Sequence, residues 1–264
     1  MRRIFLVAVI AAVLVFEGCA VGKRTAEQSA EQPVSQQTAG SDARQRAKVH
    51  TELGTLYMQR GNMGVALDEA RAALSADSAY APAYNLLGLV YMQLRENPAA
   101  ESNFEKALAA APADPEINNS FGWFLCQTGR EQRSLQYFQA AIKSPLYATP
   151  ALPLTNAGIC SMRIKDDRAA EDYFGRAMRL DANNDRALYF LADITYRQGR
   201  IAAARLHLQE LHKIAEPSPE SLWLGVRIER KLGDRDAEAR LAAQLRRRFP
   251  GSPEQQMLMQ GQFD

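Results

Sequence analysis

Large and small apolar residues repeat along most of the chain with a period close to 34 residues. The clearest copy spans 81–114, where apolar residues follow helical spacing in two segments separated by a short polar stretch. The defining positions are Tyr84, Leu87, Gly88 and Tyr91 in the first segment, Ala100, Phe104 and Ala107 in the second, and Pro112 at the end. This spacing predicts two antiparallel helices that approach closely where the small residues Gly88 and Ala100 face each other.

The small position of the first segment recurs along the chain at Gly54, Gly88, Gly122, Gly158, Ala192 and Gly225. The spacings predict copies at about 47–80, 81–114, 115–150, 151–184, 185–217 and 218–250. One helix pair cannot bury its own apolar face, so neighbouring copies are expected to stack. The pattern is typical of tetratricopeptide (TPR) repeats, and it predicts an all-α fold: a right-handed superhelical solenoid of about six helix-turn-helix repeats over 46–250. Ser252 followed by Pro253 is typical of a helix start, which predicts a C-terminal capping helix within 251–264.

The first residues of the chain follow a different pattern. Two arginines precede an uninterrupted apolar run of 13 residues at 4–16, which is too short for a transmembrane helix and typical of a signal peptide. Gly18-Cys19 directly after this run resembles the lipoprotein box of bacterial secreted lipoproteins. The resemblance implies that 1–18 is a cleaved lipoprotein signal peptide and that Cys19 carries the lipid. Ala20 after the cysteine then implies the outer membrane. Ordinary signal-peptide cleavage beside an incidental cysteine is the alternative.

Residues 19–45 are rich in Gln, Ser, Ala, Thr and Glu and contain few large apolar residues. Such a segment buries too little surface to offset its ordering entropy, so it is predicted to be a flexible tether. The remaining body is evenly charged: the chain has a net charge of +2, which argues against a nucleic-acid partner.

The third and fourth copies depart from the regular period. The third contains the run Asn118–Arg130, which reads NNSFGWFLCQTGR, and it is two residues longer than the period allows because of SPLYATP at 144–150. The fourth begins with LTNAGIC at 154–160. These segments resemble the type IV pilus biogenesis/stability lipoproteins of the PilW/PilF pilotin family.

The resemblance implies an outer-membrane lipoprotein on the periplasmic face that binds subunits of the pilus secretin. It also implies that the protein promotes secretin localisation and multimerisation, and pilus stability. A generic periplasmic TPR scaffold for an envelope or cell-wall assembly complex is the alternative, because the same repeats and anchor would serve it.

Two cysteines remain besides Cys19. Cys126 and Cys160 lie on the first helices of adjacent copies, which pack side by side, so a disulfide is geometrically possible in an oxidising periplasm. Two buried free thiols are the alternative.

The sequence contains no signature of catalysis. It has no Gly-rich phosphate loop and no nucleophile motif, and His207 and His212 are five residues apart, which is the wrong spacing for two ligands on one helix face. We therefore predict a monomeric, non-enzymatic protein without cofactor, metal or small-molecule substrate.

Recognition by the concave face of the solenoid is the expected activity. The repeat register places eight residues of the first three copies on that face: Thr51, Thr55, Met58, Asn85, Leu89, Met92, Asn119 and Trp123. Apolar side chains interspersed with amides suit an extended peptide or a helix. The alternative for Leu89, Met92 and Trp123 is packing between repeats. A clamp for a C-terminal carboxylate is not expected in copies two and three, whose candidate positions Asn85, Gln93 and Glu116 are neutral or acidic.

Overall fold

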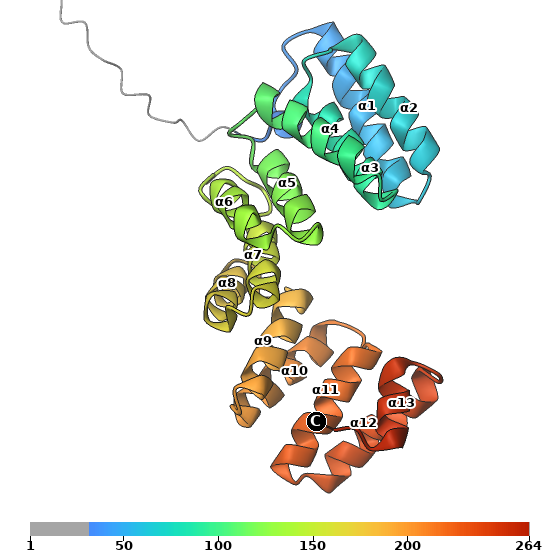
Figure 1. The fold of residues 1–264 in the computed structure, drawn as a ribbon, viewed down its shortest axis with the longest axis vertical. Coiled ribbons are helices and arrows are strands. Elements are labelled where there is room, and N and C mark those ends of the chain that lie inside the picture. The colour runs from blue at the N-terminus through green and yellow to red at the C-terminus, as the bar shows by residue number, and fades with distance from the viewer. Residues whose placement is uncertain (1–31, 264) are drawn as a thin grey trace, which may run out of the picture.

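The computed structural model describes residues 32–263, and within this range every regular element is a helix (Figure 1). Twelve helices form six successive pairs: α1 (Asp42–Gln59) with α2 (Met63–Ala76), α3 (Ala81–Gln93) with α4 (Asn97–Ala110), α5 (Pro115–Gln127) with α6 (Glu131–Ile142), α7 (Ala151–Arg163) with α8 (Asp167–Leu180), α9 (Asp185–Arg197) with α10 (Ile201–Ile214), and α11 (Pro219–Leu232) with α12 (Arg235–Arg248). A last helix, α13 (Pro253–Gln260), follows the sixth pair. The predicted all-α TPR solenoid is confirmed.

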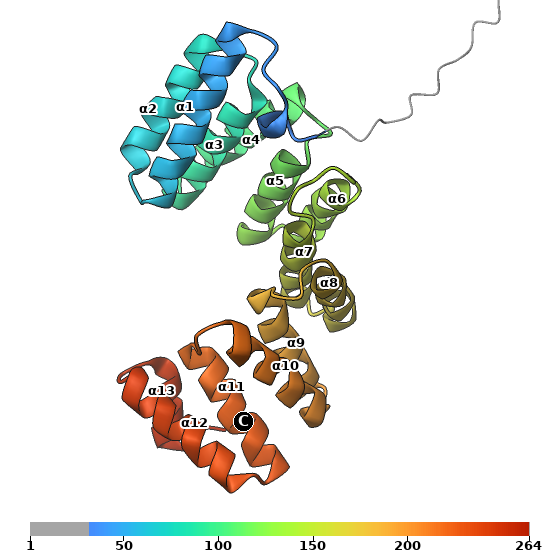
Figure 2. The same cartoon turned by 180° about the vertical axis from the view of Figure 1, so that it is seen from behind.

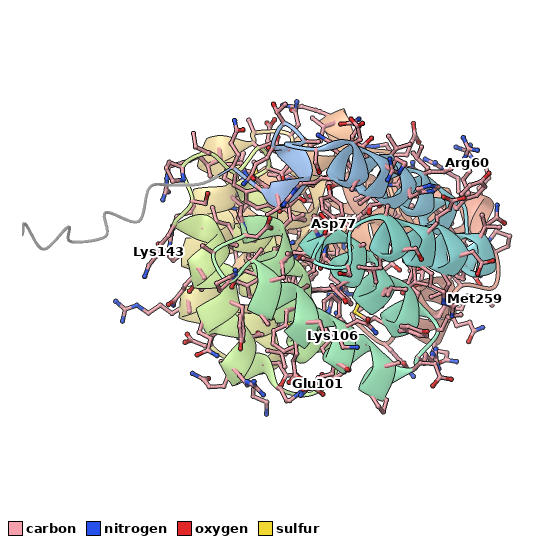
Figure 3. The ribbon with its side chains drawn as sticks, turned by 90° about the horizontal axis from the view of Figure 1, so that it is seen from above. Arg60, Asp77, Glu101, Lys106, Lys143 and Met259 are labelled. Atoms are coloured by element: carbon pink, nitrogen blue, oxygen red, sulfur yellow. A yellow bond between two sulfur atoms is a disulfide. The ribbon has the colours of Figure 1, made fainter. Side chains whose placement is uncertain are left out.

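The pairs stack in chain order into a curved superhelix. Figures 1 and 2 show the first two pairs at one end of the long axis, α5–α8 in the middle and α9–α13 at the other end, with the middle set to one side of both ends. Viewed along the long axis in Figure 3, Arg60 after α1 and Met259 of α13 lie on the same side of the molecule. The curvature gives the solenoid one concave face.

Contacts between a glycine and a phenylalanine set the helix crossing in the middle pairs. The partners are Gly88 with Phe104, Gly122 with Phe138, and Gly158 with Phe174. A Cβ added to any of these glycines would lie 2.6–2.9 Å from the ring, closer than packed carbon atoms approach. Each ring fills the space that the missing side chain leaves, so the small position in the sequence pattern is a steric requirement of the fold.

The chain enters the solenoid earlier than predicted. Helix α1 begins at Asp42, where the Ser41 side chain accepts a hydrogen bond from the backbone N–H of Arg44. Before it, a 3-10 helix (Val34–Gln36) packs on the first two repeats and hydrogen-bonds to the start of the third, and we call residues 33–37 the N-terminal strap. The described part of the predicted tether, 32–45, is therefore folded, because α5 supplies hydrogen-bond acceptors that composition does not reveal. Cys19, the signal peptide and the rest of the tether lie outside the described residues.

The last helix covers the end of the sixth pair. Helix α13 packs beside Trp223 of α11, and the Phe263 ring lies 5.3 Å from the Trp223 ring. Its start has the predicted cap, since the Ser252 side chain accepts a hydrogen bond from the backbone N–H of Gln255. Within 32–263, no helix is both long enough and apolar enough to span a bilayer.

Candidate peptide-binding groove

A groove of about 560 Å³ lies on the concave face of the first three repeats. Its long walls come from the first helices α1, α3 and α5, and Leu152 at the start of α7 extends it toward the fourth repeat. Five of the eight residues predicted for this face line it: Thr51, Thr55, Asn85, Leu89 and Asn119. The repeat register thus identified the helix face that forms the groove.

The other three predicted residues do not line this groove. Met58 packs on the core between the first and second repeats, and Met92 packs on the aromatic core between the second and third. Trp123 is half-buried against the cores around Cys126 and around Leu154. The sequence left open whether Met92 and Trp123 pack between repeats. In the structure, both side chains are partly buried in such packing.

The groove combines apolar walls with amide groups. Four leucines line it: Leu56, Leu86, Leu89 and Leu152. The Oδ1 atom of Asn85 is buried and has no hydrogen-bond partner among the described residues, so it is free to accept one from a bound N–H group. Asn119 accepts a hydrogen bond from Asn156 Nδ2 at 3.0 Å through its Oδ1 atom, which leaves its own Nδ2 as a donor.

The two threonines of α1 present a mainly apolar surface. Their hydroxyl groups donate within the helix, Thr51 to the Ala47 carbonyl at 2.8 Å and Thr55 to the Thr51 carbonyl at 2.9 Å. The donors of these side chains are therefore already used. The amides of Asn85 on α3 and Asn119 on α5 keep an unused acceptor and an unused donor, and Lys48, Glu52 and Ser120 are further polar groups in the lining.

The N-terminal strap closes one end of the groove. Its Val34 N–H donates to Asp114 Oδ2 at 2.6 Å, and the Ser35 hydroxyl donates to the Glu116 carboxylate. Ser35 and Glu116 both line the groove. Burial raises the pKa of Asp114, although three backbone N–H groups, including that of Val34, oppose the shift. Burial likewise raises the pKa of Glu116.

The segment that makes the third repeat two residues longer lines the same end of the groove. In the segment between α6 and α7, Tyr147 is 6% exposed and lines the groove together with Thr149. Burial raises the pKa of Tyr147 to about 12, so the phenol stays neutral at physiological pH. Sequence reasoning singled out 144–150 as a departure from the period, and this wall is the structural consequence of that departure.

Helices α5 and α7 are held together at three levels. The Asn119–Asn156 amide contact lies toward their first turns. Cys126 and Cys160 form a disulfide in the structure, with Cα atoms 5.9 Å apart, within the usual range for this bond. The Arg163 guanidinium donates to the Cys126 carbonyl at 2.7 Å and so caps the end of α5. Oxidation of the cysteine pair in the cell stays a prediction.

The repeats and the groove define the chain as a TPR protein. The tetratricopeptide repeat family matches residues 51–115, 85–150 and 167–219, which together exceed half of the chain. The type IV pilus assembly protein PilF of Pseudomonas aeruginosa is 30% identical over 247 residues, covering 94% of this chain and 97% of that protein. The chain therefore belongs to the PilF family of TPR proteins of type IV pilus biogenesis.

Solved structures agree with this assignment. The structure of Pseudomonas aeruginosa PilF matches with a TM-score of 0.78 and 28% identity, over 84% of this chain and 100% of that chain. The crystal structure of PilW, a widely conserved type IV pilus biogenesis factor, matches with a TM-score of 0.74 and 30% identity, over 81% of this chain and 98% of that one. The predicted resemblance to the PilW/PilF family is confirmed.

Proposed function

We propose that this protein is an outer-membrane lipoprotein that acts as a pilotin in type IV pilus biogenesis. Its groove binds a segment of the pilus secretin, and the lipid on Cys19 carries the bound subunit to the outer membrane. There it promotes secretin multimerisation and so stabilises the pilus. Family membership supports the pathway, and the lipoprotein-like sequence at Gly18-Cys19 supports the anchor.

One observation carries the binding part of the proposal. Asn85 Oδ1 is buried and has no hydrogen-bond partner among residues 32–263, and Asn85 lines the groove on α3 together with Leu86 and Leu89. Leaving such an acceptor unsatisfied costs about 1–3 kcal/mol, which a bound N–H group would recover. An apolar groove with an unused acceptor therefore suits a polypeptide that contributes both backbone N–H groups and apolar side chains.

The direct test places a charge in the groove. Leu56 lines the groove and is 50% exposed, so Leu56→Arg should leave the core intact while opposing an apolar ligand. Leu180→Arg is the matched control, because Leu180 is 58% exposed at the end of α8, outside the groove. In a deletion strain we expect the control to restore detergent-resistant secretin multimers and the groove variant to fail. Equal restoration by both variants would remove the groove from the mechanism.

The anchor is tested separately with Cys19→Ser. We expect secretin subunits to accumulate away from the outer membrane in cells that carry this variant, as measured by membrane fractionation. Unchanged outer-membrane multimers would contradict transport by the lipid. Intact multimers with altered cell shape in the deletion strain would favour the scaffold alternative.

A further inference from the structure

Trp123 and Arg186 lie beyond the residues that line the groove, on the side of the fifth repeat. Asn119 and Ser120 line the groove on α5, and Trp123 lies one helical turn further along the same helix. The side chain of Arg186, from the first turn of α9, lies over the Trp123 ring with Cζ 5.6 Å from the ring centroid. Because α7 separates α5 from α9 in the stack, this contact bridges the third and fifth repeats.

The start of α9 is fixed next to the groove. Its N-cap residue Asn184 donates from Nδ2 to the Thr155 hydroxyl of α7 at 3.0 Å, one turn after the groove residue Leu152. Arg186 also lines a second hollow of about 230 Å³ with Tyr189 and Phe190. The acidic residues Asp185 and Glu216 line the same hollow.

Arg186 has no anionic partner among the described residues. Three other arginines of this region are engaged: Arg163 with the Cys126 carbonyl, Arg197 with Asp167, and Arg200 with Glu171. The carboxylate of the adjacent Asp185 accepts a hydrogen bond from the Arg186 backbone N–H at 2.7 Å and forms no ion pair with the guanidinium. Desolvation lowers the pKa of Arg186, although the Asp185 carboxylate opposes the shift, and the residue as a whole stays exposed to solvent.

We propose that Arg186, stacked on Trp123, binds a carboxylate of the polypeptide held in the groove. The partner segment then has two parts: apolar residues with free N–H groups over α1, α3 and α5, and an Asp, a Glu or a chain-terminal carboxylate at Arg186. A planar guanidinium held against an aromatic ring presents its N–H groups to a carboxylate in a fixed plane. This inference rests on the groove binding a polypeptide, as proposed above, and not on the identity of that polypeptide.

The test needs no knowledge of the natural partner. Random peptides of about 12 residues, long enough to span the concave face, are displayed on phage and selected on the mature chain carrying Cys19→Ser. We expect the selected peptides to share one acidic position. Exchanging that Asp or Glu for its amide should weaken binding about tenfold, the usual effect of losing a charge-assisted hydrogen bond.

The peptide variants are combined with the protein variant Arg186→Gln in a double-mutant cycle. This variant should bind the acidic peptide and its amide counterpart equally, whereas Arg179→Gln, an exposed arginine on α8, should retain the preference of the natural chain. Trp223→Phe leaves Trp123 as the single indole of the chain, and its fluorescence should change on binding of the acidic peptide.

Three outcomes overturn the proposal: selection of no peptides, selection without an acidic position, and an acid preference that survives Arg186→Gln. The secretin experiments test a separate claim. A wrong secretin assignment leaves the peptide result unaffected, and loss of the acid preference leaves the Leu56→Arg result unaffected.

Discussion

Neighbouring repeats are joined by different chemistry in the two halves of the molecule. Between the third and fourth repeats, the links are a disulfide, an amide pair and a guanidinium bound to a backbone carbonyl. One ion pair, Arg130 with Glu101, joins the second and third repeats, and further along ion pairs predominate. Arg197 of α9 bonds Asp167 of α8, and Arg205 of α10 bonds Glu229 of α11 and Asp234 beyond it.

The difference follows the position of the groove. The disulfide and the amide pair respond little to salt, because neither carries a charge. Partly exposed ion pairs are individually weak and are screened by salt. The third repeat, which forms one wall of the groove, is thus joined to the fourth by a disulfide and an amide pair. The last repeats are joined by contacts that exchange more easily with water.

Removing a ring from the core should have the largest effect. Phe138 is fully buried against Gly122, and we expect Phe138→Ala to lower the free energy of unfolding by about 3–5 kcal/mol. Leu208→Ala, at the same register position two repeats later, should cost about 2–5 kcal/mol. Urea denaturation measures both values. Hydrogen exchange shows whether each loss is local: Phe138→Ala should loosen α5–α8, and Leu208→Ala should loosen α9–α12. Identical exchange profiles would mean that the two halves unfold as one unit.

Breaking the disulfide tests the covalent side of the comparison. The disulfide joins two cysteines at a sequence separation of 34. In the chain-entropy estimate, the double variant Cys126→Ser with Cys160→Ser should therefore lower the free energy of unfolding by about 3–4 kcal/mol. Mass spectrometry of periplasm-derived protein should find neither thiol open to alkylation without a reductant. Two alkylated thiols in folded protein would show that the pair is reduced, and the amide pair and Arg163 would then carry the junction alone.

Sequence reasoning was most reliable where the determinants are local. Gly88 and Phe104 occupy neighbouring helices of one repeat, so their spacing reveals the crossing directly. The strap was missed because its partners, Asp114 and Glu116, lie about 80 residues away, and its own composition is that of an unfolded segment.

Adjacent asparagines show the same limit at single-residue scale. Asn118 Nδ2 donates to the carbonyls of Pro112 and Asp114 and holds the loop before α5. Asn119 instead faces the groove and contacts Asn156. Only the helix register separates these roles. That Arg186 has no ion-pair partner among the described residues becomes apparent only once the fourth and fifth repeats are folded.

The strap should make stability depend on pH. Burial raises the pKa of Glu116 above its ordinary value of 4.5, so the folded state holds a proton that the unfolded state releases. The free energy of unfolding should therefore fall as pH rises from the unfolded pKa through the folded pKa, and change no further from this group above it. Glu116→Gln should reduce this slope, as measured by urea denaturation between about pH 4 and pH 8. Glu210→Gln, on the exposed side of α10, is the control. If Glu116→Gln left the slope unchanged, the titration of Glu116 would not contribute to the pH dependence of the free energy of unfolding.

The smallest effect is expected at an ion pair that joins the fourth and fifth repeats. The Arg197 side chain is 41% exposed and contacts Asp167 of α8 and Asp193 of its own helix, which raise the pKa of Arg197. Because both pairs are open to solvent, Arg197→Gln should lower the free energy of unfolding by only about 0.5–1 kcal/mol, and about 1 M NaCl should remove most of the difference from the natural chain. The disulfide variant should keep its deficit at the same salt concentration, since chain entropy is not screened. If salt abolished both deficits, or neither, the contrast between a covalently held groove and an electrostatically joined remainder would be lost.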